Sequence, residues 1–374
     1  MKIFSNFESG NIHVVLADSP DDIQLTIPAD NQSDFAQWFH FRLESQPDIS
    51  HHISLQNLST SAYPEGWKEY DVVASYDREE WFRIPAEFDG DTLTFTVIPE
   101  YGSMYFAYFA PYPYDRHLDL LHQAQTHFHC RLETLGATLD NHDISLLTIG
   151  EPADGKKNIW VIGRQHPGET MAEWFIEGLL QRLLDATDTV GRALLDNVVF
   201  HIVPNMNPDG SIRGHLRTNA IGVNLNREWQ TPSLERSPEV YYVRERMLQT
   251  GVDMFLDIHG DEAIPYNFVA GSEGVPAYDA RMEGLEKAFK RVLLTITPEF
   301  QDEHGYEKNV PGTANLTVAT NWVAQEFKCL AYTVEMPFKD HIDYPDEFYG
   351  WSPERSVAYG QDVLAGIWAV VDKL

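Results

Sequence analysis

The sequence has few cysteines, few positive charges and no long apolar run. Its 374 residues include only two cysteines, Cys130 and Cys329, which lie far apart in the chain. A framework of disulfides is therefore not supported, which is typical of proteins in a reducing compartment. The first residues, MKIFSNFESGNIHVV, contain no apolar core of the length found in secretory signals. These absences predict a cytoplasmic protein.

Positive charge is scarce: Lys and Arg total 27 against 57 Asp and Glu, which gives a formal net charge of −30. Nucleic acids bind to basic surfaces, so this balance argues against a nucleic-acid partner. No stretch approaches the roughly 18–20 apolar residues needed to cross a membrane, so we expect no membrane partner. An apolar fraction of 43% suffices for folded cores, and the length favours two domains.

The first part of the chain, up to about residue 110, has the pattern of an antiparallel β-sandwich. Short apolar runs, often alternating, are separated by turn-forming Asp, Asn, Gly and Pro. An aromatic, proline-containing segment then leads into a helical pattern. We place the domain boundary there, with domains at 1–115 and 116–374. An apolar strand surface in the first domain is a candidate surface for a homo-oligomer. The predicted strands are NIHVVLA, IQLTI, WFHFRLE, HISLQNL, YDVVASY, WFRIPAEF and TLTFTVIPEY.

Beyond the boundary, apolar strands alternate with amphipathic helices. We expect buried strands at 158–165, 197–205, 252–260 and 329–337. This alternation predicts an α/β domain around a mixed or mostly parallel sheet. In such sheets, ligands bind beyond the carboxyl ends of the strands.

Three side chains at strand ends form a candidate zinc site. His166 and Glu169, in WVIGRQHPGET, follow the first of these strands, and His259 lies at the end of another. Two imidazoles and a carboxylate are a known ligand set of catalytic zinc. Asp257 lies two residues before His259, on the same face of its strand, and could orient a ligand imidazole. A His-x-x-Glu pair also arises by chance, so an ordinary loop is the alternative.

Neighbouring residues complete this interpretation. Thr170 and Glu173 have the spacing of a capping box at the start of the following helix. Other segments rich in histidine lack a matching carboxylate, so we interpret them as structural or surface residues. They are HFHC (127–130), which we place in a helical stretch, and HH (51–52) in the β domain.

Zinc-dependent hydrolysis also needs a base and a positive charge. Glu335, in the apolar segment AYTVEMPF, is the candidate base; the alternative is a strand glutamate paired with an arginine. The segment RTNAIGVNLNREW (217–229) supplies Arg217 and Arg227. Arginine's planar fork suits a carboxylate or an oxyanion. An Asn226–Arg227 pair near zinc would hold a terminal carboxylate and restrict the enzyme to chain ends.

A series of motifs within residues 120–374 resembles the zinc carboxypeptidases of the carboxypeptidase A type. In order, they are HPGE, NMNPDG, GVNLNREW, SPEV, DIHG and YTVEMPF. The first domain, ending in YFAYFAPYPYDRHLDLL, is similar to the cytosolic carboxypeptidase branch, whose β-sandwich precedes the catalytic domain. The resemblance implies an N-terminal antiparallel β-sandwich followed by a three-layer α/β/α domain with a mixed sheet.

The resemblance also implies roles for individual residues. It assigns one zinc ion per chain to His166, Glu169 and His259. Glu335 matches the general base and Arg217 the arginine that stabilises the oxyanion, while Asn226 and Arg227 match the pair that binds the terminal carboxylate. The implied function is a zinc metallocarboxypeptidase, a peptide hydrolase that removes the C-terminal residue of a peptide or protein through a zinc-activated water.

Some positions depart from the family pattern. Asn315 in PGTANLT stands where glutamate-trimming cytosolic carboxypeptidases have arginine, and with the −30 charge it weakens a glutamate-chain assignment. Tyr306, Tyr266 and Tyr332 are candidates for a substrate-capping tyrosine. Two alternatives remain: a zinc amidohydrolase or deacylase acting on a small acyl amino acid or cell-wall peptide, and a non-catalytic peptide-binding module. The presence of Glu335 speaks against the module.

Overall fold

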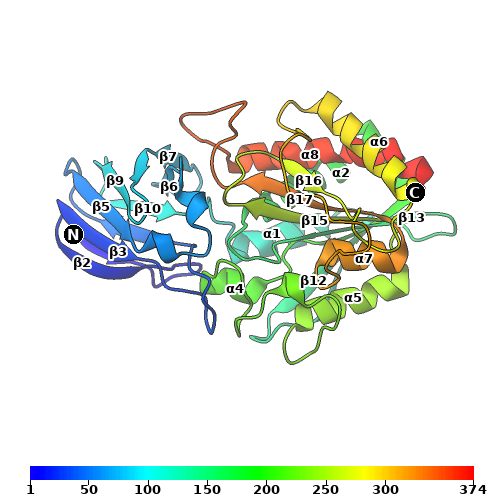
Figure 1. Cartoon of the computed structure of the whole chain (residues 1–374), viewed down its shortest axis with the longest axis horizontal. Helices are drawn as coiled ribbons and strands as arrows, with labels where there is room; N and C mark the ends of the chain where they lie inside the picture. The colour runs from blue at the N-terminus through cyan, green and yellow to red at the C-terminus, as the bar shows by residue number, and fades with distance from the viewer.

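The first part of the chain is a two-sheet domain. The computed structural model describes residues 1–374 and places this domain beside a larger α/β part (Figure 1). All neighbouring strands pair antiparallel except β3 and β5, which are parallel. Phe95 of one sheet packs on Phe106 of the other, with ring centroids 5.6 Å apart. One sheet has the order β1 (Lys2–Phe4), β4 (His40–Glu44), β10 (Ser103–Ala107), β6 (Val72–Ser75), β7 (Phe82–Ile84). The other has the order β2 (His13–Ser19), β3 (Asp22–Thr26), β5 (His51–Gln56), β9 (Leu93–Val97), β8 (Ala86–Phe88).

The second part is built on a seven-stranded mixed sheet, as predicted. Its four central strands are parallel, whereas β11, β12 and β16 pair antiparallel at the edges. The order is β11 (Cys130–Ala137), β12 (Asp143–Ile149), β14 (Val198–Val203), β13 (Lys157–Gly163), β15 (Met254–Asp261), β17 (Leu330–Pro337), β16 (Phe268–Ala270).

Helices cover both faces of this sheet and form three layers (Figure 1). One apolar cluster joins the sheet to α2, α3, α6 and α8, and another joins its opposite face to α5 and α7. No helix has the length and apolar character needed to cross a membrane. The helices are α1 (Tyr114–Ala124), α2 (Met171–Leu183), α3 (Thr189–Asn197), α4 (Pro208–Arg213), α5 (Pro238–Thr250), α6 (Ala280–Ile296), α7 (Ala319–Phe327) and α8 (Pro353–Val370).

The two parts share one apolar core. The larger cluster, of 67 buried residues, runs from the N-terminal sheets to α8. Tyr108 stacks on Phe338 with ring centroids 4.7 Å apart. Buried Arg83 donates hydrogen bonds to the carbonyls of Phe338 and Trp351, at 2.7 and 3.2 Å. The domain boundary proposed at 115/116 lies in the first turn of α1 and stays a prediction.

Two local predictions need correction. The segment HFHC (127–130) is not helical, because α1 ends at Ala124 and β11 begins at Cys130. The apolar pattern of α1 simply stops before these histidines. Strand β10 was absent from the predicted set, since its aromatic run continues into Phe109 and Ala110 without a turn signal.

Candidate metal centre

The turn between β13 and α2 presents His166 and Glu169 at the carboxyl edge of the sheet. Buried Arg164, whose φ is +56°, lies just beyond β13. Its guanidinium donates to the carbonyls of Pro167 (2.9 Å) and Tyr112 (2.8 Å). From the other side, the Gly168 amide donates to the carbonyl of Leu216 at 2.8 Å. The turn is therefore held by neighbours on both sides.

The capping box expected at the start of α2 is not formed. The Thr170 hydroxyl donates to the carbonyl of Ala110 at 2.8 Å instead of capping the helix. The Glu173 carboxylate is buried between His117, 2.7 Å away, and Arg164. Both side chains serve contacts with residues distant in sequence, which the local spacing could not reveal.

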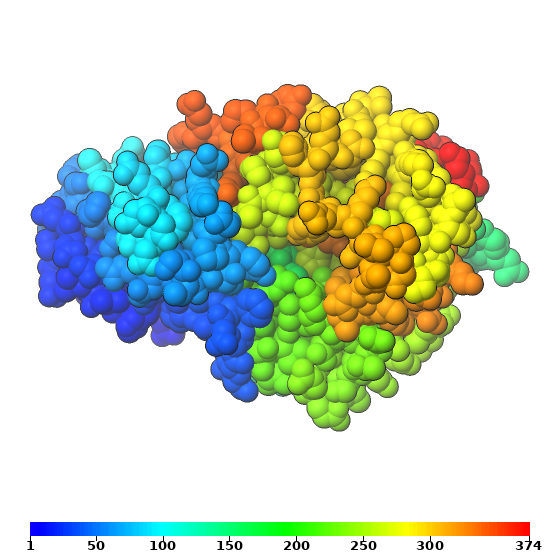
Figure 2. All heavy atoms as spheres, viewed as in Figure 1, coloured from blue at the N-terminus to red at the C-terminus, as the bar shows by residue number.

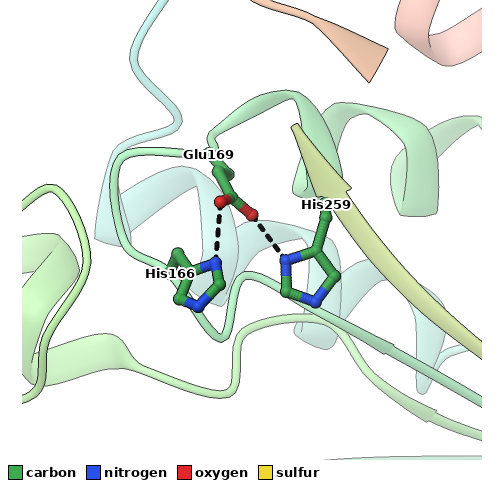
Figure 3. A group of neighbouring side chains, drawn as sticks. All are labelled: His166, Glu169 and His259. Carbon is green, nitrogen blue, oxygen red and sulfur yellow. Dashed lines mark hydrogen bonds and ion pairs between the residues drawn. The ribbon is translucent and has the colours of Figure 1, made fainter. Parts of the chain in front are cut away.

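His166, Glu169 and His259 converge on one point (Figure 3). The Glu169 carboxylate lies between the two imidazoles: Oε1 is 2.7 Å from His166 Nδ1, and Oε2 is 2.7 Å from His259 Nδ1. One atom from each residue lies within 4.8 Å of the others, and all three side chains are buried. Three strand-end residues predicted to act together thus share one site.

The hydrogen-bond partners of the two Nε2 atoms make this set of side chains suitable for a zinc ion. His166 Nε2 faces Asn224 Oδ1 at 3.2 Å, and His259 Nε2 faces Asp257 Oδ2 at 2.9 Å. With the ring protons on Nε2, facing these acceptors, each Nδ1 keeps a lone pair for a cation. Burial lowers the pKa of His259, but the neighbouring carboxylates of Asp257 and Glu169 outweigh it and raise that pKa. Burial is the main cause that lowers the pKa of His166 to about 3, and the positive charge of Arg217 is the second. The low pKa favours the neutral imidazole that a metal needs. Asp257 occupies the orienting position that its spacing predicted.

Glu335 lies directly beside His259, because the two residues are partners in the register of β17 and β15. Burial raises the pKa of the Glu335 carboxyl well above its usual range. Its Oε1 accepts a hydrogen bond from the Tyr306 hydroxyl at 3.0 Å, whereas Oε2 has no partner in the protein. No arginine pairs with this carboxylate, so the alternative of a structural ion pair is not observed.

A cavity of about 610 Å³ brings the predicted substrate residues to the same place. Arg217, Asn226 and Arg227 line it together with His166, Glu169, His259 and Glu335. Asn226 is fixed by accepting from the Ala319 amide at 2.8 Å. The Arg227 guanidinium donates to the carbonyl of Asn226 at 2.6 Å. All seven residues expected from the sequence therefore border one space.

Of the three candidate tyrosines, only Tyr306 lines this cavity. Tyr332 is fully buried, and Tyr266 stacks on His304 with ring centroids 4.5 Å apart. Asn315 lies outside the cavity lining; its side chain accepts from the amide and hydroxyl of Thr317, at 3.0 and 2.8 Å. The Asn315 side chain therefore stabilises the local turn at residues 315–317.

Tyr63 and Glu262 are among the lining residues that sequence reasoning did not assign to the site. Glu262 lies three residues after His259, just beyond β15, so its closeness to the strand end was a usable signal. Tyr63 belongs to the N-terminal part, where no pattern pointed to the site.

Family models match nearly the whole chain. Residues 3–109 match the cytosolic carboxypeptidase N-terminal domain, and residues 115–357 match the zinc carboxypeptidase domain. An uncharacterized protein of Zymomonas mobilis is 49% identical over the whole chain and 97% of its own length. Mouse cytosolic carboxypeptidase 6 is 29% identical over 71% of this chain, which spans about half (54%) of that relative.

Solved structures agree with these matches. A metallo-carboxypeptidase from Pseudomonas aeruginosa, in complex with (2-guanidinoethylmercapto)succinic acid, is 48% identical with a TM-score of 0.97, over 100% of both chains. A metallo-carboxypeptidase from Burkholderia cenocepacia is 49% identical with a TM-score of 0.96, over 99% of both chains. The chain thus belongs to the zinc carboxypeptidase family, in the branch that carries the cytosolic carboxypeptidase N-terminal domain.

Proposed function

We propose that this metallocarboxypeptidase removes single residues from the C-terminus of peptides or proteins that have a free α-carboxylate. The observation that carries the proposal is the shared cavity, in which the metal-ligand set, a carboxylate with a free oxygen and two arginines face one another. The ligand in the Pseudomonas aeruginosa structure, a succinic acid derivative, contains two carboxylates. In this chain, Arg217 and Arg227 in the same cavity support recognition of a terminal carboxylate.

Each residue has a task that follows from its position. We infer that one zinc ion is held by His166, Glu169 and His259. When bound, zinc acts as a Lewis acid that lowers the pKa of a coordinated water to about 7 and polarises the scissile carbonyl. The positive charge of a bound zinc ion would favour the ionised form of Glu335 against the effect of burial. The Glu335 carboxylate would then accept the proton of the attacking water at Oε2, its free oxygen, and deliver it to the leaving amine.

Charge on the substrate is met by the two arginines. Arg217 donates hydrogen bonds to the carbonyl oxygen as negative charge develops there. Asn226 and Arg227 bind the terminal carboxylate, for which a guanidinium fork is well shaped. A chain end without this carboxylate would leave Arg227 unpaired, so binding would be weak. The cytoplasmic location stays a prediction from the sequence.

Paired peptides test this proposal. The purified protein, with its zinc content measured, is incubated with a peptide library in which each sequence has a free or an amidated C-terminus. We expect mass spectrometry to show loss of one residue at a time from the free members only, and loss of cleavage after chelation. Equal cleavage of the amidated members would contradict the proposal and favour an amidohydrolase.

A further inference from the structure

A turn of the N-terminal domain, residues 30–35 between β3 and β4, packs on the loop that carries Arg217. Figures 1 and 2 show blue residues of this domain lying against the green residues near α4. Asp30 is 4% exposed, and its Oδ1 accepts from the amide of Leu216 at 2.6 Å. Its Oδ2 accepts from the amides of Arg217 and Thr218, at 2.8 and 2.9 Å. One buried carboxylate thus accepts hydrogen bonds from three consecutive backbone amides, and the middle one belongs to Arg217.

Asn31 fixes the rest of the same loop. Its amide donates to His215 Nε2 at 3.1 Å, and its side chain donates to the carbonyl of Ala220 at 2.7 Å. His215 Nδ1 in turn donates to the carbonyl of Thr218 at 3.0 Å. The loop from 215 to 220 is therefore bound by the N-terminal turn at both ends.

The side chain of Arg217 is also held by the N-terminal domain. Its guanidinium carbon lies 5.5 Å from the ring centroid of Phe35 and 5.6 Å from that of Tyr63. Phe35 ends the same turn, since its carbonyl accepts from the Asp30 amide at 2.8 Å. No hydrogen bond or ion pair within the protein engages the Arg217 guanidinium. Its donors therefore remain free for substrate, and its position depends on its backbone and on two aromatic rings.

We propose that Asp30 is a positioning residue for Arg217, so that the N-terminal domain completes the carboxypeptidase site. This rests on the proposed function, in which Arg217 stabilises the charge on the substrate carbonyl oxygen. Such donors act only when they are fixed before charge develops, and a shift of about 1 Å can cost on the order of a hundredfold in rate. Loss of the Asp30 carboxylate would free three amides and let the loop shift.

The first test compares Asp30→Asn with Asp34→Asn. Asp34 is an exposed carboxylate on the same turn with no hydrogen-bond partner, so its substitution removes the same charge without touching the loop. We expect Asp30→Asn to lower kcat about tenfold, with KM within about twofold and full zinc content, because the arginine acts mainly in the transition state. We expect Asp34→Asn to match the wild type. Equal kcat values for the two variants would overturn the proposal.

A double-mutant cycle shows whether Asp30 acts through the arginine. We expect Arg217→Ala to lower kcat about a hundredfold, and the added Asp30→Asn change to lower it no further. An undiminished loss in the Arg217→Ala background would mean that Asp30 serves the fold alone, which would refute the inference. Wild-type kcat in Arg217→Ala itself would instead contradict the proposed role of the arginine.

The rings of Phe35 and Tyr63 beside the Arg217 guanidinium give a test that does not depend on the folding of an Asp30 variant. Tyr63→Leu removes one ring under the guanidinium, and we expect kcat to fall several-fold with unchanged zinc content. Tyr63→Phe keeps the ring and should restore the lost kcat. If Tyr63→Leu has the wild-type kcat, the N-terminal domain does not position Arg217.

Discussion

Glu335 has a position that separates metal binding from proton transfer. It neighbours His259 across β15 and β17, yet it stands outside the three-residue ligand set. We therefore expect Glu335→Gln, which keeps the shape of the side chain and removes its basicity, to lower kcat about a thousandfold while zinc content stays at the wild-type level. Metal analysis and turnover of the same preparation check both parts. A variant with undiminished turnover would exclude this residue as the base.

His259→Ala is the matched contrast. It removes one ligand from the set, so zinc content and turnover should fall together. If this variant kept a full complement of zinc, the ligand set proposed above would be wrong.

Glu239, at the start of α5, is a second buried carboxyl, remote from the cavity. Neither of its oxygens has a hydrogen-bond partner, and burial, with the negative charge of Asp209 as a further cause, raises its pKa to about 8. Because the pKa of Glu239 is higher in the folded state, its contribution to the free energy of unfolding is fully present below the usual pKa of 4.5. This contribution is lost as the pH rises through the folded-state pKa of about 8. The folded protein therefore holds this side chain as a neutral acid at pH 7.

We expect the free energy of unfolding to fall by on the order of 3 kcal/mol between pH 5 and pH 8 because of Glu239 alone. Chemical denaturation at several pH values measures this loss, and Glu239→Gln should abolish that share of it, because its amide stays neutral throughout. Glu245→Gln, an exposed change on the same helix, is the control. Parallel pH profiles for the wild type and Glu239→Gln would show that the carboxyl is already ionised at low pH.

At the scale of elements, helices α2 and α8 touch through a pair of glycines. A Cβ on Gly178 would come within 1.9 Å of the Val357 carbonyl, and one on Gly360 within 2.0 Å of the Phe175 carbonyl. The helix backbones thus meet without side chains between them. Helix α2 begins just after Glu169, so this contact lies on the helix that follows the turn with His166 and Glu169.

Gly178→Ala should therefore lower the free energy of unfolding by about 3 kcal/mol, as expected for overpacking against backbone. Gly284→Ala in α6 is the matched control, because nothing lies within 4 Å of its added Cβ. That control should raise stability by up to about 1 kcal/mol through the better helix propensity of alanine. Similar unfolding midpoints for both variants in urea would show that the α2–α8 contact adjusts freely.

The elements that the sequence predicted well are those whose pattern is local. The four parallel strands have continuous apolar runs, and the residues proposed as zinc ligands follow strand ends in motifs only a few residues long. Five strands were not predicted: β1, β10, β11, β12 and β16, all of which lie outside the four central parallel strands. The aromatic run of β10 and the histidines before β11 carry no turn signal that separates them from the segments before them. Thr170 could not be interpreted correctly, since its hydroxyl binds the carbonyl of Ala110, 60 residues away.

At the scale of the whole molecule, the N-terminal domain could be predicted as a fold but not as part of the site. Its contribution is made by Asp30, Phe35 and Tyr63, which follow no motif of their own. The bonds from Asp30 cross 186–188 positions of sequence. Only the packing of the two parts on a shared core brings these residues to Arg217, so their role follows from the assembled molecule.

The net charge of −30 is a property of the whole surface, and it should affect how fast substrates arrive. Long-range fields change association rates by about ten- to a thousandfold and are screened beyond roughly 10 Å at 0.1 M salt.

The test of this effect compares two peptides with the same last four residues, one with three lysines and one with three glutamates farther upstream. At low salt we expect kcat/KM to favour the lysine peptide about tenfold, with similar kcat. Raising the salt to about 0.5 M should reduce the ratio to within about twofold. A ratio that does not change with salt would show that the preference arises from contacts in the cavity, and that the net charge does not affect the association rate.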